Sequence, residues 1–291
     1  MIPRALPPRS AARIGLILAC GLPLLAAGGQ ETARPLLATP APAVAIRPTQ
    51  PPGLAGYGCV TCHAEVSAEW AASAHGLAWV DEQFNAQLAE KKRPELCYGC
   101  HAPEPLLAGV LSPRPDVREA NRDLGVHCES CHQDESGAML GPRGTSVPAH
   151  PSKVSEHMLV PGSDELCSSC HGTNIGPVIG IAKDFASAKM AARGLSCVGC
   201  HMAPVERSWA SDAPVRTGRS HALQTPRDPA FLRLAFAFEH RVVDGKSVVA
   251  VKNQAGHRVP GLVGRVITLR AELLDAAGAE LERLELAFDE R

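Results

Sequence analysis

Five times the chain repeats the same short arrangement of two cysteines and a histidine, Cys-x-x-Cys-His. The cysteine pairs are Cys59 and Cys62, Cys97 and Cys100, Cys128 and Cys131, Cys167 and Cys170, and Cys197 and Cys200. The histidines that follow them are His63, His101, His132, His171 and His201. Two thiols at this spacing can form thioethers to the vinyl groups of one porphyrin, and the next imidazole reaches the iron. The sequence therefore predicts five covalently attached haem c groups, with iron as the metal.

A cysteine pair alone is also typical of a zinc ribbon, a dithiol redox site or a disulfide. A zinc ribbon has no use for a histidine directly after the second cysteine, and here one follows every pair. The eleventh cysteine, Cys20, lies in the N-terminal leader. No thiol beyond the leader is left for a disulfide framework, so we interpret cysteine use as haem attachment.

The opposite axial position of each iron decides what the haem does. A second histidine gives a closed, low-potential electron-transfer site, a methionine raises the potential, and an open position permits substrate chemistry. Seven histidines lie outside the motifs, enough for five bis-His haems: His75, His127, His150, His157, His221, His240 and His257. The methionines Met139, Met158 and Met202 are alternative candidates, although we expect Met202 to pack against porphyrin.

The sequence around the motifs resembles the multihaem c-type cytochromes grouped with the tetrahaem cytochrome of nitrification and hydroxylamine oxidoreductase. Trp70, Ser73 and His75 have the spacing Trp-x-x-Ser-x-His, and similar segments occupy residues 96–103, 125–132 and 253–260. The resemblance covers roughly residues 57–275. It implies bis-His haems packed in close pairs on a mainly helical, loop-rich chain. The group also contains members with one open haem.

The resemblance also implies which histidines are the sixth ligands. His75, His221 and His257 match ligand positions of the family, and His150 is more family-like than His157. His127 adjoins Cys128, so it is expected to ligate a neighbouring haem. The expected distal ligands are therefore His75, His127, His150, His221 and His257. His157 competes with His127 and His150, and His240 is expected to be structural.

Catalysis at one open haem is the main alternative to an electron carrier. Multihaem nitrite reductases use a lysine at the catalytic haem, and all five motifs here end in histidine. A hydroxylamine-type enzyme needs a crosslinking tyrosine, and the only tyrosines, Tyr57 and Tyr98, lie beside haem motifs. If a haem is open, it would reduce or oxidise a small nitrogen or sulfur compound, with Arg207 or His157 as oxyanion-binding candidates. A third interpretation is a docking subunit of a larger redox complex.

The composition indicates how these sites are positioned. Leu, Ile, Val and Phe are sparse between residues 57 and 225, so this part buries little apolar surface by itself. We expect the porphyrins to form the core and the haem-free chain to be largely unfolded. The predicted fold is a mainly α, loop-rich multihaem cytochrome with a small β-rich C-terminal domain. The expected division is a signal peptide at 1–29, a Pro/Ala-rich linker at 30–56, a pentahaem domain at 57–228 and a C-terminal domain at 229–291.

Local patterns predict helices over 64–72, 74–92, 183–193 and 229–237. Strands are predicted over 239–243 and 246–251, joined by a hairpin turn at Asp244-Gly245, and over 263–274 and 281–288.

The N-terminal sequence indicates where the protein is located, and the composition limits which partners it can have. A basic segment, an apolar run at 14–27 and small residues after it are typical of an export signal, which predicts a periplasmic protein without a membrane span after leader removal. An uncleaved leader or a lipidated Cys20 are the alternatives for a membrane anchor. Nothing indicates nucleic-acid binding. The expected partners are redox proteins, such as a membrane quinol-oxidising or outer-membrane complex.

Overall fold

The computed structural model describes residues 57–159, 163–176, 178–259, 261 and 265–288. The expected signal peptide and the expected linker lie outside the described residues. In the part of the chain that is described, no helix has the length and apolar character needed to cross a membrane.

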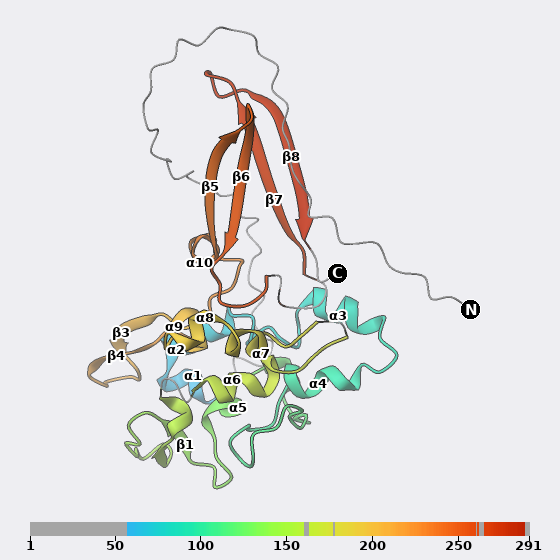
Figure 1. The fold of residues 1–291 in the computed structure, drawn as a ribbon. Coiled ribbons are helices and arrows are strands. Elements are labelled where there is room, and N and C mark those ends of the chain that lie inside the picture. The colour runs from blue at the N-terminus through green and yellow to red at the C-terminus, as the bar shows by residue number, and fades with distance from the viewer. Residues whose placement is uncertain (1–56, 160–162, 177, 260, 262–264, 289–291) are drawn as a thin grey trace.

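Each Cys-x-x-Cys-His motif forms a short helix or the last turn of one. These helices are α1 (Cys59–Cys62), α4 (Glu95–His101), α5 (Cys128–His132), α6 (Ser163–His171) and α9 (Cys197–His201). Residues three and four positions apart share one face of a helix, so a single turn directs both thiols and the imidazole the same way. Figure 1 shows these helices gathered in one body of the molecule. The local geometry therefore suits one porphyrin per motif.

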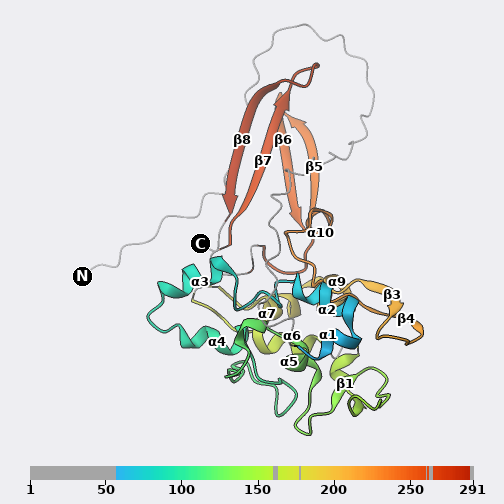
Figure 2. The same ribbon diagram turned by 180° about the vertical axis from the view of Figure 1, so that it is seen from behind.

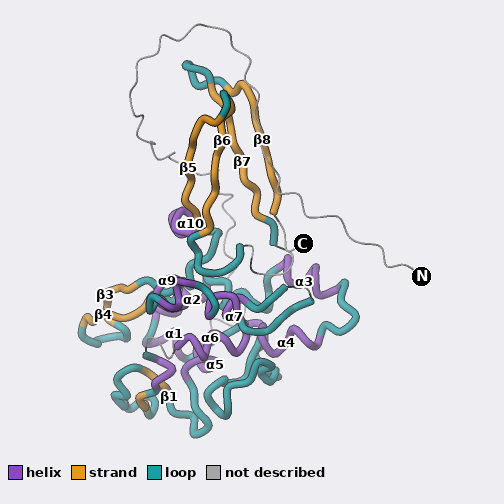
Figure 3. The backbone as a smooth tube through the Cα atoms, viewed as in Figure 1, coloured by secondary structure: helices purple, strands orange, loops and turns teal. Residues whose placement is uncertain are grey.

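The remaining helices connect the motifs. They are α2 (Ala64–Ala71), α3 (Glu82–Ala89), α7 (Ile181–Ala186), α8 (Lys189–Ala192) and α10 (Pro229–Ala235), with 3-10 turns η2 (Arg122–Leu124) and η3 (Glu156–Met158). The helices predicted over 64–72 and 229–237 are confirmed. Loops make up much of this body, as Figure 3 shows in teal.

Two of the predicted helices are shorter than the sequence indicates. The segment 74–92 is helical only over α3, because Ser73 Oγ accepts from the backbone N–H groups of His75 and Gly76 and turns the chain. Asp81 then caps α3 by accepting from Phe84 N at 2.8 Å. The segment 183–193 divides into α7 and α8. Both breaks use side-chain or loop contacts that helix propensity does not reveal.

Four two-stranded sheets complete the fold. They are β1 (Met139–Gly141) with β2 (Ser152–Val154), β3 (Pro204–Ser208) with β4 (Val215–Arg219), β5 (Phe236–Val243) with β6 (Lys246–Asn253), and β7 (Ile267–Leu274) with β8 (Glu280–Phe288). The first pair is parallel and the others are antiparallel hairpins. The strands predicted near the C-terminus are confirmed, and Asp244 and Gly245 form their turn with φ of 51° and 71°.

The last two hairpins extend away from the helical body (Figures 1 and 2). One face of β7 and β8 carries opposed apolar pairs, such as Leu269 with Leu286, and the other carries the ion pair Arg270–Glu285. This alternation is the period-two pattern of a half-buried sheet.

The apolar core of the helical body is small. Trp70, Ala71 and Leu124 form its one described cluster, with Tyr57 packed beside them. Trp70 Nε1 donates to the carbonyl oxygen of Val126 at 2.7 Å. A core of this size leaves the space around the motifs to be filled by something other than side chains.

Candidate haem sites

Six of the twelve histidines are oriented by a hydrogen bond from Nδ1 to a backbone carbonyl oxygen. The motif histidines contact backbone carbonyl oxygens as follows: His63 with Trp209, His101 with Ala78, His132 with Leu140 and His201 with Gln224. Among the other histidines, His221 contacts the Arg219 carbonyl and His257 the Arg258 carbonyl. A proton on Nδ1 leaves the Nε2 lone pair for a metal, and this arrangement is typical of metal-ligating histidine.

Four motif histidines each face one histidine from outside the motifs. The ring-centroid distances are 6.4 Å for His63 and His150, 6.1 Å for His171 and His75, 6.0 Å for His132 and His221, and 6.4 Å for His201 and His257. A metal–imidazole bond of about 2 Å on each side puts two axial imidazole centroids roughly 6 Å apart. The residues present therefore fit a bis-His haem iron at four of the five motifs.

Each of the four facing histidines comes from a different part of the fold. His75 follows α2, His150 precedes β2, His221 follows β4, and His257 follows β6. Every pair thus joins segments that are distant in the chain, and an iron bound between them would tie those segments together.

Burial keeps two of the facing histidines, His75 and His221, neutral. Burial, together with the nearby His171, lowers the pKa of His75 to about 3. Burial also lowers the pKa of His221 to about 4, with His132 acting in the same direction. Because only the neutral imidazole ligates a metal, these environments favour the ligating form.

His101 differs from the other motif histidines. Its ring stacks on Phe84 with a centroid distance of 3.6 Å and an interplanar angle of 9°. Phe84 covers the face of the imidazole, whereas a metal would bind at its Nε2 edge. Among the described residues, no second histidine ring lies opposite His101. The site of the second motif therefore offers one histidine, His101, and the described residues place no histidine on its opposite side.

His127, expected from the resemblance as a distal ligand, has protein partners on both ring nitrogens. Its Nδ1 accepts from Ser130 N at 3.1 Å and so caps α5, and its Nε2 lies 3.2 Å from Glu129 Oε2. The ring also stacks on Tyr57 with a centroid distance of 5.6 Å. The structure brings His127 opposite none of the motif histidines within the described ranges.

The remaining candidates also lie away from the four pairs. His157 Nδ1 is 3.7 Å from Glu165 Oε2, and His240 lies exposed in β5. No ring contact in the described part of the chain joins either histidine to a motif histidine. Arg207, an oxyanion candidate, lies beside His221 and not beside His101.

Cysteine contacts indicate which haem sites adjoin. Thiols of different motifs lie close enough to shift one another's pKa in three pairs: Cys59 with Cys128, Cys100 with Cys170, and Cys167 with Cys197. Cys131 also interacts electrostatically with Cys170. The first motif therefore adjoins the third, and the fourth adjoins the second, the third and the fifth. These contacts bring the motifs close enough for five porphyrins to lie edge to edge or face to face.

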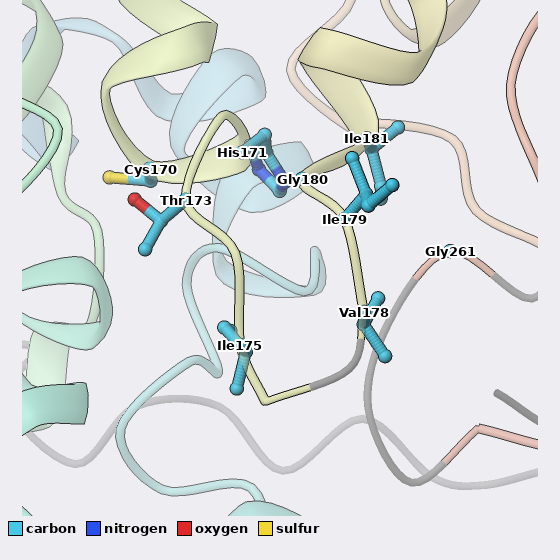
Figure 4. A pocket seen from close by; sticks show the side chains of 9 residues that line it. All are labelled: Cys170, His171, Thr173, Ile175, Val178, Ile179, Gly180, Ile181 and Gly261. Carbon is cyan, nitrogen blue, oxygen red and sulfur yellow. The ribbon is translucent and has the colours of Figure 1, made fainter. Parts of the chain in front are cut away.

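A pocket opens directly at the fourth motif (Figure 4). Cys170 and His171 line one part of it, and the isoleucines Ile175, Ile179 and Ile181 line much of the rest. Apolar side chains next to the attachment thiol and the axial histidine suit the edge of a porphyrin.

Three polar residues that support these sites were not predicted from sequence. Arg118 is 7% exposed and donates to the carbonyl oxygens of Pro103, Ala120, Asn121 and Gly125 and to Ser130 Oγ. Glu69 accepts from the backbone N–H of His221 at 2.7 Å and from Arg207. Asp184 accepts from Arg258 Nε at 3.1 Å, next to His257. Nothing local in the sequence marks Glu69 and Asp184, because their partners are remote in the chain.

Comparison with known proteins adds one finding. Residues 58–133 match the family model described as cytochrome c554 and c-prime. This segment holds the first three motifs and His75. No curated protein and no solved structure matches the chain. The match supports a c-type cytochrome that binds haem c and its iron covalently and transfers electrons.

Proposed function

We propose that this chain is a pentahaem c-type cytochrome that passes electrons between redox proteins through closely packed, mostly bis-His haems. The observation that supports this most is the set of four His–His pairs at 6.0–6.4 Å, each with one motif histidine. Each haem, when bound, supplies an iron that accepts and releases one electron. At four of the five sites, two histidines of the chain would hold that iron from both sides.

The haem sites form a branched path. Contacts between motif cysteines connect the first site to the third and the third to the fourth, and from the fourth the path divides to the second and the fifth. Electrons from the first and third sites therefore pass through the fourth site to reach either the second or the fifth.

The haems also determine which partners suit the protein. The sequence has a formal net charge of −1, and five haems add two propionates each, so the holoprotein is about ten charges more negative. A partner with a basic docking face is favoured. Attachment of haem c outside the bacterial cytoplasm, together with the expected export signal, favours a periplasmic location.

The test is the haem count and the spin state of the exported protein. Mass spectrometry should give five attached haems, and low-temperature EPR should show low-spin signals from four bis-His irons. Variants His75→Ala, His150→Ala, His221→Ala and His257→Ala should each convert one low-spin haem to high spin. His240→Ala is the matched control and should change nothing. Fewer than five haems, or an unchanged spectrum in all four variants, would contradict the proposal.

A second candidate function, binding and conversion of a small nitrogen or sulfur compound, is favoured by the site of the second motif. His101 has Phe84 on its face and no second histidine opposite it in the described residues. We expect one high-spin EPR signal in the resting protein that shifts when nitrite or hydroxylamine is added. If only low-spin signals appear and neither compound changes them, the protein is a carrier alone.

A further inference from the structure

A buried arginine lies between two of the haem sites. Arg207 in β3 has 8% of its side chain exposed, and its guanidinium group lies over the Trp209 ring, 5.1 Å from the centroid. One terminal nitrogen donates to Glu69 Oε1. Its Nε is also buried and has no hydrogen-bond partner in the described part of the chain. A buried charged donor without an acceptor is unfavourable, so an acceptor is expected at this position.

The contacts of Arg207 place it at the junction of the first and third motifs. Its partner Glu69 also accepts from the backbone N–H of His221 at 2.7 Å and from Ser220 Oγ at 3.1 Å. Trp209, beneath the guanidinium group, supplies the carbonyl oxygen that accepts from His63 Nδ1. The Arg207–Glu69 pair thus contacts the segment that carries His221 and the segment that orients His63.

We propose that Arg207 is a carboxylate-binding residue whose Nε donates to a haem propionate at the junction of the His63 and His132–His221 sites. This inference rests on the proposed function. A propionate is the anionic group that each haem brings, and a guanidinium fork can hold two carboxylates at once. Glu69 is the positioning residue, because it accepts from one terminal nitrogen of the guanidinium group and leaves Nε available for the propionate. The Arg207–Glu69 pair therefore keeps the junction close to charge balance until the propionate adds its negative charge.

The experiment compares Arg207→Gln and Arg207→Lys with Arg216→Gln in the holoprotein. Arg216 lies opposite Arg207 in the same hairpin but is exposed, so it is the matched control for charge. Loss of the cation should disfavour reduction of a neighbouring haem by about tenfold, which is about 59 mV for a one-electron couple. Arg207→Lys keeps the charge and loses Nε, so its potential shift should be smaller.

A second measurement separates propionate binding from a structural role. The propionate-bending band in the resonance Raman spectrum should shift in Arg207→Gln and Arg207→Lys and should stay unchanged in Arg216→Gln. If Arg207→Gln does not fold, the double variant Glu69→Gln with Arg207→Gln removes both charges of the pair, and its propionate band should shift in the same way.

An unchanged propionate band in every Arg207 variant would overturn the proposal and leave Arg207 as a structural partner of Glu69, with a water on Nε. A different result, a haem count below five in the wild-type protein, would contradict the proposed function. The two failures are therefore distinguishable.

Discussion

A ligating histidine needs both a free nitrogen and a fixed position, and at His257 a contact outside the site supplies the position. Its Nδ1 donates to the carbonyl oxygen of Arg258, and Arg258 is held by the carboxylate of Asp184 in α7. The ion pair is partly exposed, with 22% of the Asp184 side chain and 57% of the Arg258 side chain accessible. Its role is therefore to place a loop more than to stabilise the fold.

Asp184→Asn tests that role. Because exposed ion pairs contribute about 0–1 kcal/mol, the free energy of unfolding should fall by less than about 1 kcal/mol. The His257 loop should nevertheless loosen, and part of the haem attached at the fifth motif should become high spin by EPR. Glu285→Gln, which breaks the exposed ion pair with Arg270 in the outer hairpin, is the control. A wild-type spectrum in Asp184→Asn would show that the clamp does not position His257.

His127 has a structural role in the observed geometry, because it caps α5. Its removal should lower the stability of the protein by the contribution of that cap. His127→Ala should cost about 1 kcal/mol of stability, because Ser130 N loses its side-chain acceptor. His127→Asn should retain most of that stability, since asparagine is a favoured N-cap residue. Neither variant should create a high-spin haem. A new high-spin signal in both variants would instead make His127 a ligand, as the sequence resemblance implies.

The attachment residues were a prediction that the sequence alone allows, because two cysteines and a histidine within five positions make a complete chemical signature. The pairing of histidines was not predictable, because His63 and His150, for example, are brought together only by the fold. The same holds for Glu69 and Asp184, whose partners lie far along the chain. Local chemistry can be read from a sequence, whereas a meeting of distant residues cannot.

At the scale of the elements, polar side chains hold the loops together by hydrogen bonds. Arg118 links the loop that follows α4 to the loop that precedes α5 through four carbonyl oxygens and one hydroxyl. Gly125 in the second loop has φ of 58°, and a Cβ there would come within 2.4 Å of the His75 carbonyl oxygen. That close approach permits the hydrogen bond from Val126 N to His75 O at 2.9 Å, which fixes the backbone of a facing histidine.

Arg118→Lys should be costly although it keeps the charge. A lysine ammonium has three donors on one atom and cannot reach acceptors spread around the edge of a guanidinium group. Loss of at least two charge-assisted hydrogen bonds predicts a decrease of about 2–4 kcal/mol in the free energy of unfolding. Denaturant titration followed by Soret circular dichroism would measure it. Arg93→Lys, at a side chain that is 71% exposed, should stay within about 0.5 kcal/mol of wild type.

Some elements were predictable and others were not, for physical reasons. Asp244-Gly245 between two apolar alternations specifies a hairpin by itself, and β5 and β6 form it. The hairpin of β3 and β4 has no such signal, because its strands read Pro-Val-Glu-Arg-Ser and Val-Arg-Thr-Gly-Arg. Trp209 packs across this hairpin: its Nε1 donates to the Arg216 carbonyl oxygen at 2.8 Å, and its ring leaves no room for a Cβ at Gly218.

At the scale of the whole molecule, the haem-binding body has too little apolar packing of its own. Its buried cluster is three side chains with Tyr57 beside them, and the four His–His pairs leave gaps sized for metal ligation. Ordering each residue costs about 1–2 kcal/mol of backbone entropy, which a cluster of that size cannot offset. The missing apolar surface and the missing crosslinks are both what five porphyrins would supply.

We predict that haem attachment and folding are one event. A variant with all ten motif cysteines changed to serine should show no cooperative thermal transition of the helical body by near-UV circular dichroism, and its amide protons should exchange rapidly. The holoprotein is the control and should unfold cooperatively. The β5–β6 and β7–β8 hairpins pair by their own hydrogen bonds, so any residual structure should be confined to them. A cooperative transition in the haem-free variant would mean that side-chain packing alone folds this chain, and the porphyrins would then be passengers of the fold and not its core.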